Sequence, residues 1–225
     1  MKLIYRGRYT GADQLPRADL PPSAVRFREP EDTAALNRAA IKWCLLALAA
    51  AVVLGAATIP LRGGLELGFG FRVTAGCAAS FLTLLPHELL HGACFGRGAE
   101  VHLFVSPKDL MAFVVCTKPI SKGRFIFMSL LPNLVFGWLP FLVWCVTPYA
   151  GMGSDVLLWF SFCCISFGGG DYMNVWNALR QMPRGSVQQI SGFHSYWYMP
   201  RCWLFPYSDR RRMKLSLRWT PSWTI

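Results

Sequence analysis

Residues 125–147 read FIFMSLLPNLVFGWLPFLVWCVT and contain no ionisable side chain. A helix needs about 20 predominantly apolar residues to cross a bilayer core of about 30 Å. Three other stretches are similarly apolar, at residues 43–61, 73–95 and 156–179. The sequence therefore predicts an all-α integral membrane protein with about four transmembrane helices.

The composition of the chain agrees with a membrane protein. Hydrophobic residues make up 53% of the 225 residues and charged residues only 16%, against roughly 25% charged in a typical globular domain. This composition disfavours a disordered chain, a coiled coil and a nucleic-acid-binding module. The net charge of +11 is compatible with binding to anionic lipid or to nucleic acid. The high hydropathy favours the lipid bilayer, so we expect a lipid bilayer as partner and no nucleic acid.

The flanks of the apolar region differ from it in composition. Residues 1–40 form a polar arm without the apolar core of a cleaved signal peptide. Residues 41–180 hold the four expected spans, and residues 181–225 form a basic tail rich in aromatic residues. Aromatic and basic residues together are typical of the headgroup layer.

The positions of the basic residues predict the orientation, because Lys and Arg resist translocation. Of the 23 Lys and Arg, eight lie in residues 1–42, two in 62–72, five in 96–124, none in 148–155 and eight in 176–225. We therefore expect a multi-pass protein of the cell membrane with both termini and the long central connection in the cytoplasm.

The central connection carries a short β-hairpin signal. Residues 101–105 alternate in polarity, residues 106–109 favour a turn, and residues 110–116 are apolar and β-branched. We expect a cytoplasmic-side β-hairpin between the second and third spans, close to the site described next. Its free edge either takes up an extended peptide or has no substrate role.

Ionisable residues are rare within the spans, where burying a charge costs at least ~2.5 kcal/mol. Three of them form the motif HELLH at residues 87–91. Because residues four apart share one face of a helix, His87 and His91 can bind a single ion. Glu88 lies about 100° round the helix and can reach a metal-bound water. Neutral imidazole favours zinc.

A catalytic zinc needs a third protein ligand. The extended pattern HExxHxxGxxH would require Gly at position 94 and His at 97, but the chain has Cys94 and Arg97. Glu100 and His102 are rival candidates at the membrane edge.

Asp171 is favoured as the third ligand by its depth. His87 follows Arg72 by 15 residues, and Asp171 follows Asp155 by 16. At about 1.5 Å per residue, both side chains lie at a similar level in the membrane.

The neighbours of Asp171 in the sequence offer supporting roles. Gly168, Gly169 and Gly170 either permit close approach of the fourth span to the second or break the helix. Asn174 could hydrogen-bond a ligand carboxylate or an oxyanion, or simply pack between helices. Asn133 and Asn177 are weaker candidates.

Several segments resemble a family of small multi-pass membrane proteins classed as zincin peptidases: HELLHG at 87–92, KPIS at 118–121, GDYMN at 170–174, PRG at 183–185 and the opening MKLIYRGRYTGADQLP. That family is similar in layout to the site-2 proteases, which cut within or near the membrane. The resemblance implies His87, His91 and Asp171 as zinc ligands and Glu88 as catalytic base. Site-2 proteases usually carry Asp-Gly where this chain has Asp171 followed by Tyr172.

These features together predict a membrane-embedded zinc metalloprotease acting on a peptide or membrane-protein substrate. The alternative is a non-proteolytic zinc-binding membrane scaffold or metal-handling protein. An intact Glu88 favours the enzyme, because a scaffold needs no general base.

Overall fold

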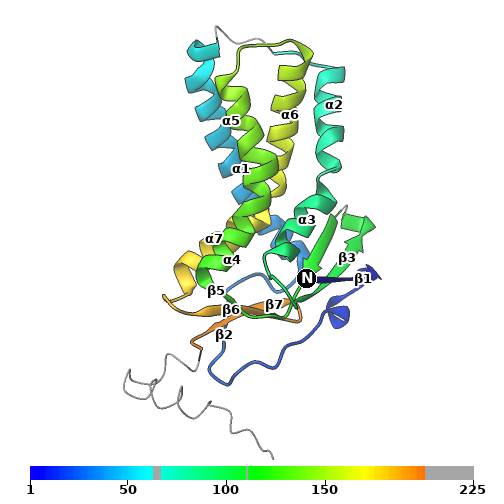
Figure 1. The fold of residues 1–225 in the computed structure, drawn as a ribbon, viewed down its shortest axis with the longest axis vertical. Helices are drawn as coiled ribbons and strands as arrows, with labels where there is room; N and C mark the ends of the chain where they lie inside the picture. Colours follow the sequence, from blue (N-terminus) through cyan, green and yellow to red (C-terminus); the bar gives the residue numbers. More distant parts are fainter. Residues whose placement is uncertain (63–66, 110, 201–225) are drawn as a thin grey trace, which may run out of the picture.

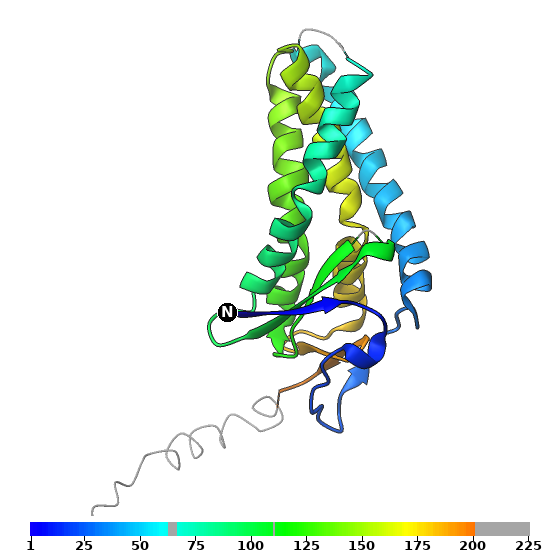
Figure 2. The same cartoon turned by 90° about the vertical axis from the view of Figure 1, so that its right-hand side faces the viewer.

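The computed structural model describes residues 1–62, 67–109 and 111–200. A group of long helices forms one part of the molecule, and two small β-sheets cover one end of it (Figures 1 and 2). The helices are α1 (Thr33–Thr58), α2 (Phe71–Phe81), α3 (Leu84–Ala93), α4 (Lys122–Pro132), the π-helix η4 (Asn133–Trp138), α5 (Leu139–Val146), α6 (Met152–Phe167) and α7 (Gly169–Gln181). Short 3₁₀ turns occur at η1 (Ala12–Gln14), η2 (Ile59–Arg62) and η3 (Pro107–Asp109).

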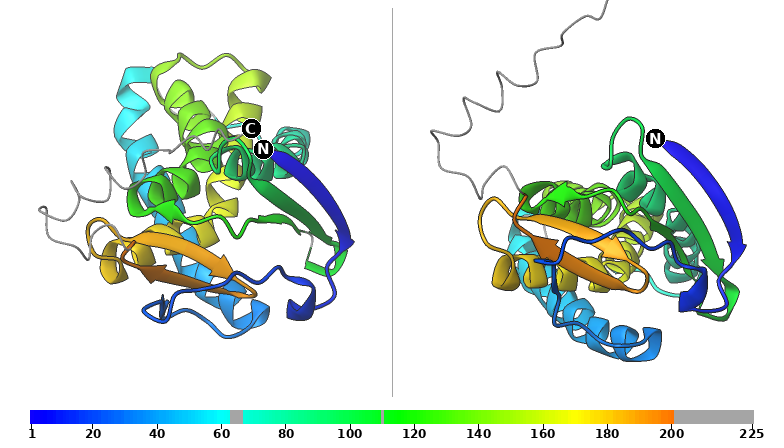
Figure 3. Two further views of the ribbon diagram at one scale, coloured as in Figure 1. Left: turned by 60° about the horizontal axis from the view of Figure 1, so that its bottom comes forward. Right: turned by 90° about the horizontal axis from the view of Figure 1, so that it is seen from below.

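The prediction of an all-α fold is wrong, because the described residues mix helices with strands. The strands are β1 (Lys2–Arg8), β2 (Val25–Arg26), β3 (Glu100–Ser106), β4 (Met111–Val115), β5 (Ile120–Ser121), β6 (Val187–Ser191) and β7 (His194–Tyr198). They form a three-stranded sheet of order β1-β3-β4 and a four-stranded sheet of order β2-β7-β6-β5. Seen from below, the two sheets extend across one end of the helices (Figure 3).

The hairpin expected between the second and third apolar stretches is present. Strands β3 and β4 pair antiparallel, from His102 opposite Val115 to Ser106 opposite Met111. This hairpin is extended by β1, which pairs with β3 in parallel. The sequence of the arm did not reveal β1, because its partner strand follows almost a hundred residues later and β1 is rich in charged residues.

The second sheet includes part of the expected tail. Strands β6 and β7 form a hairpin whose two turn residues are Gly192 and Phe193. Gly192 has a φ of +62°, and glycine is favoured at the first position of such a turn. The aromatic side chains of Tyr196, Trp197 and Tyr198 therefore belong to a strand, and residues 201–225 of the tail lie outside the described residues.

The apolar stretches are helical but not straight. Within the described residues, three stretches are long and apolar enough to cross a membrane by length and composition: Thr33–Arg62, Phe71–Ala93 and Lys122–Val146. The fourth consists of α6 and α7, which are bent by 47° relative to each other. Three of the four stretches change direction or helix type along their length, at Leu82–Thr83, at Pro132–Asn133 and at Gly168.

An ion pair with a buried carboxylate and a partly exposed guanidinium joins the ends of α2 and α6 that lie far from the sheets. Arg72 Nη1 lies 2.6 Å from Asp155 Oδ2, and the same carboxylate accepts hydrogen bonds from Tyr149 Oη at 3.0 Å and from Gly68 N at 2.8 Å. Asp155 is 1% exposed. Arg72 and Asp155 are the residues from which the positions of His87 and Asp171 along their apolar stretches were counted. Because these two residues are in contact, α2 and α6 start at the same level.

Glu29 connects the N-terminal arm to the second sheet. Its side chain is largely buried, its Oε1 accepts a hydrogen bond from Ser195 N at 2.7 Å, and it lies 3.5 Å from His194 Nδ1. Burial raises the pKa of Glu29 to about 7, and burial also lowers the pKa of His194. Both shifts favour uncharged side chains, so this contact is not a strong ion pair.

Replacing Glu29 should therefore change how stability depends on pH. The folded protein keeps a proton on Glu29 up to about pH 7, whereas the unfolded chain releases it near the ordinary value of 4.5, so the carboxyl group destabilises the fold as the pH rises. In thermal unfolding experiments in detergent, the free energy of unfolding of Glu29→Gln should rise relative to that of the parent between about pH 5 and pH 8. The rise should be on the order of 3 kcal/mol.

The control for this experiment is Asp19→Asn, a change at an exposed carboxylate of the same arm. Its difference from the parent should stay constant over the same pH range. A pH-independent difference for Glu29→Gln would contradict the assignment of a buried, protonated Glu29.

Candidate metal site

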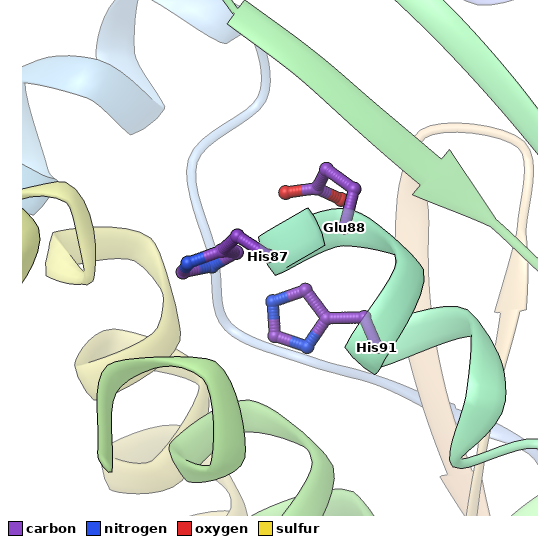
Figure 4. A group of neighbouring side chains, drawn as sticks. All are labelled: His87, Glu88 and His91. Carbon is purple, nitrogen blue, oxygen red and sulfur yellow. The ribbon is translucent and has the colours of Figure 1, made fainter. Parts of the chain in front are cut away.

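Helix α3 presents two imidazole rings and one carboxylate on neighbouring positions. Its first turn contains Pro86, which helix starts tolerate because their N–H groups have no intrahelical acceptor. The rings of His87 and His91 lie 4.9 Å apart between centroids. One ligand atom from each of His87, Glu88 and His91 lies within 4.8 Å of the others. Figure 4 shows that all three side chains leave the same turn of α3.

Asp171 reaches both histidines from α7. His87 Nε2 lies 3.1 Å from Asp171 Oδ2, and His91 Nε2 lies 3.2 Å from Asp171 Oδ1. The three side chains are only 11 to 13% exposed. The structure therefore brings together the two motifs that sequence depth had placed at one level.

The spacing of these ligand atoms suits zinc. Four ligands at 2.0–2.1 Å in a tetrahedron lie about 3.3 Å from one another. The observed distances, 3.1 Å from His87 Nε2 to Asp171 Oδ2 and 3.2 Å from His91 Nε2 to Asp171 Oδ1, involve the two different carboxylate oxygens and are each within about 0.2 Å of that value. The two imidazoles and the carboxylate are also the ligand set that catalytic zinc sites use, so the residues fit the metal.

One carboxylate oxygen of Glu88 is bound to the first sheet. Its Oε2 accepts a hydrogen bond from Val114 N in β4, at 2.9 Å. Since Asp171 contacts both imidazole Nε2 atoms and Glu88 is bound to β4, Asp171 is the better placed third ligand. Glu88 keeps a second carboxylate oxygen beside the histidines.

The break between α6 and α7 brings Asp171 to its position. A side-chain carbon at Gly168 would lie 1.9 Å from Asn133 Oδ1, and one at Gly169 would lie 2.8 Å from the Ala40 carbonyl oxygen of α1. The break agrees with the second reading of the glycine triplet, whereas neither Gly168 nor Gly169 closely approaches the second apolar stretch. The helix breaks at Gly168, and the close approach is to α1 and η4.

The rival ligands Glu100 and His102 are engaged elsewhere, in β3. Glu100 Oε1 pairs with Lys2 Nζ at 2.8 Å, and His102 Nδ1 accepts a hydrogen bond from Arg6 Nε at 2.8 Å. Both partners belong to β1. These contacts at the sheet surface disfavour both residues as zinc ligands.

Asn133, which the sequence had ranked below Asn174, is the amide that contacts a candidate ligand. Its Nδ2 donates to Asp171 Oδ2 at 2.7 Å. Asn174 lines the site cavity, and no hydrogen bond between described residues joins it to Asp171. Asn133 lies in a different helix from Asp171, so no local spacing links the two, and the only signal was a polar residue after Pro132 in an apolar stretch.

Tyr172, the departure from the Asp-Gly pattern, also contacts η4. Trp138 Nε1 donates a hydrogen bond to Tyr172 Oη at 3.0 Å. Consecutive residues of α7 are thus bound to the two ends of η4. Tyr172 helps to fix the orientation of the helix that carries Asp171.

A cavity of about 360 Å³ lies over the site. It is lined by the four site side chains and by residues of α1, β4 and α4, among them Leu36, Phe113 and Met128. Strand β4 is an edge strand of its sheet. Because Val114 N points to Glu88, the backbone groups of β4 that are not paired with β3 face this cavity.

Comparison with known proteins gives one match. No curated protein and no solved structure matches the chain. Residues 80–187 match the family described as "Putative zincin peptidase", and this range includes the HELLH motif and Asp171. The match supports the zincin peptidase family for this chain, and with it a zinc metallopeptidase.

Proposed function

We propose that this protein is a membrane-embedded zinc metalloprotease that hydrolyses peptide bonds in or near the membrane. The observation that carries the proposal is the convergence of His87, His91 and Asp171 at distances that suit zinc, with Glu88 on the same turn of helix. The match to the zincin peptidase family supports the same reaction class.

His87, His91 and Asp171 would hold the metal. Bound zinc supplies acidification of a water molecule and polarisation of the scissile carbonyl. The two imidazoles must be uncharged, with their Nε2 atoms free to bind the metal. Asp171 contributes one negative charge, so the metal with its three protein ligands would carry a net charge of +1, which favours a developing oxyanion.

Glu88 would act as general base and then as general acid. The N–H of Val114 holds Oε2, which leaves Oε1 to accept the proton of the attacking water. The same carboxyl group would pass this proton to the leaving amine. The water would reach Glu88 through the cavity that lies beside β4.

Strand β4 offers a docking edge for the substrate. An extended peptide can add to an exposed sheet edge through main-chain hydrogen bonds. The edge of β4 that does not pair with β3 runs beside Glu88, which binds its Val114 N–H, and beside the cavity. A peptide bound there as an added strand would have its backbone next to the base.

The outer surface of the helices supports a membrane location. Leu45, Leu46 and Val53 of α1 are each more than half exposed, and only Ala51 and Gly55 of that helix are buried. An apolar outer face of this kind is stable in lipid and costly in water. We keep the expected orientation, with the sheets and both termini in the cytoplasm.

The metal assignment predicts the zinc content of purified variants. Parent protein in detergent should contain about one zinc per chain by elemental mass spectrometry. His87→Ala and Asp171→Ala should each lose it, because two remaining protein ligands hold zinc weakly. His102→Ala and Glu100→Gln are matched controls that should keep it. Zinc retained in Asp171→Ala but lost in Glu100→Gln would contradict the proposed ligand set.

The base assignment predicts a separation of binding from turnover. Glu88→Gln should keep zinc, since Glu88 is not a proposed ligand, and should lose at least about 100-fold in cleavage rate. The assay would follow cleavage of a membrane-peptide library in proteoliposomes by mass spectrometry, with Glu100→Gln as the control. Cleavage by Glu88→Gln at the parent rate would refute its role. A parent that binds zinc but cleaves nothing would favour the scaffold alternative.

A further inference from the structure

The third apolar stretch changes from α-helix to π-helix at Pro132 and Asn133. Both residues are fully buried and lie beside the candidate metal site. Single π-helical turns inside α-helices often occur at functional sites. The contacts of these two residues show what the change of helix type provides.

Pro132 frees a backbone carbonyl group for His91. In an α-helix the N–H of residue 132 would donate to the carbonyl oxygen of residue 128, but proline has no N–H. The Met128 carbonyl oxygen instead lies 2.9 Å from His91 Nδ1. The carbonyl group that Pro132 leaves unpaired is therefore the one that binds the histidine.

This contact determines which nitrogen of His91 carries the proton. A carbonyl oxygen only accepts, so Nδ1 must be the donor. In the neutral ring, Nε2 then keeps its lone pair, and Nε2 is the atom that faces Asp171. The Met128 carbonyl thus holds His91 in the tautomer and orientation that a metal ligand needs.

Asn133 holds the other side of the site. Its Nδ2 donates to Asp171 Oδ2 at 2.7 Å and approaches the Ser129 carbonyl oxygen at 3.3 Å. Its Oδ1, packed against Gly168, has no hydrogen-bond partner among the described residues. A buried amide with an unpaired oxygen destabilises a fold, so an amide at this position is poorly explained by packing alone.

We propose that Pro132 and Asn133 are a positioning pair that fixes His91 and Asp171 for metal binding. Pro132 acts through the Met128 carbonyl, and Asn133 acts directly on the carboxylate. The inference rests on the proposed zinc site. Neither residue touches the reacting atoms, so their loss should weaken metal binding and alter its geometry.

The first test removes the amide from Asn133. Asn133→Leu keeps a similar volume but donates no hydrogen bond, so the zinc dissociation constant should rise about 10- to 100-fold, as for lost partners of metal ligands. Asn177→Leu is the matched control, because Asn177 is a buried amide of α7 that binds Gln181. The constant would be measured in detergent by competition with a chromophoric chelator.

The second test restores the missing N–H at position 132. In Pro132→Ala the new N–H competes with His91 for the Met128 carbonyl, so zinc binding should weaken about 10-fold while the metal-free protein unfolds at an equal or higher temperature, since proline inside a helix is unfavourable. Pro140→Ala, at the start of α5, is the matched control and should leave zinc binding unchanged.

A spectroscopic measurement distinguishes positioning from general loosening. Cobalt(II) bound in place of zinc has visible absorption bands that report the ligand geometry. Asn133→Leu and Pro132→Ala should shift these bands, and both controls should match the parent.

Parent-like zinc affinity and spectra in both variants would overturn the inference while leaving the proposed function intact. Equal weakening in the controls would also overturn it. A parent protein that binds no metal would overturn the proposed function and this inference together.

Discussion

A buried polar site is stable only if the protein itself supplies a partner for each polar group, because burying an unpaired polar group costs free energy. The candidate site meets this constraint from three directions. The Met128 carbonyl binds His91, the Asn133 amide binds Asp171, and the Val114 N–H binds Glu88. These supports come from α4, η4 and β4, so the site needs both the helices and the first sheet.

The breaks in the helices follow from the same constraint. Inside a continuous helix the backbone N–H and carbonyl groups are hydrogen-bonded to one another. A carbonyl or N–H group becomes available for another partner where the helix is interrupted. The α4–η4 junction at Pro132 supplies the carbonyl group for His91. The α6–α7 junction at Gly168 turns the chain by 47° and places Asp171 in the first turn of α7. Irregular helices at this level are thus part of how the site is built.

The sequence predicted features that depend on residues close together in the chain. It was less informative about contacts between residues far apart in the chain. HELLH lies on one turn, so its spacing alone predicted that His87 and His91 face the same way. The common depth of His87 and Asp171 could be predicted because Arg72 and Asp155 mark one level, and the structure joins them in an ion pair. Strand β1 and the Asn133 contact were missed, because each depends on a partner far along the chain.

The pairing of the strands also restricts how the chain can cross a bilayer. Strand β1 pairs with β3, and β5 pairs with β6, and paired strands must lie in one compartment. The number of crossings within each intervening segment must therefore be even. Between β1 and β3 lie the candidate spans Thr33–Arg62 and Phe71–Ala93, so if one of them crosses, the other must cross as well. Between β5 and β6 lie Lys122–Val146 and the bent pair α6–α7, so if the first of these crosses, the bent pair must cross as well.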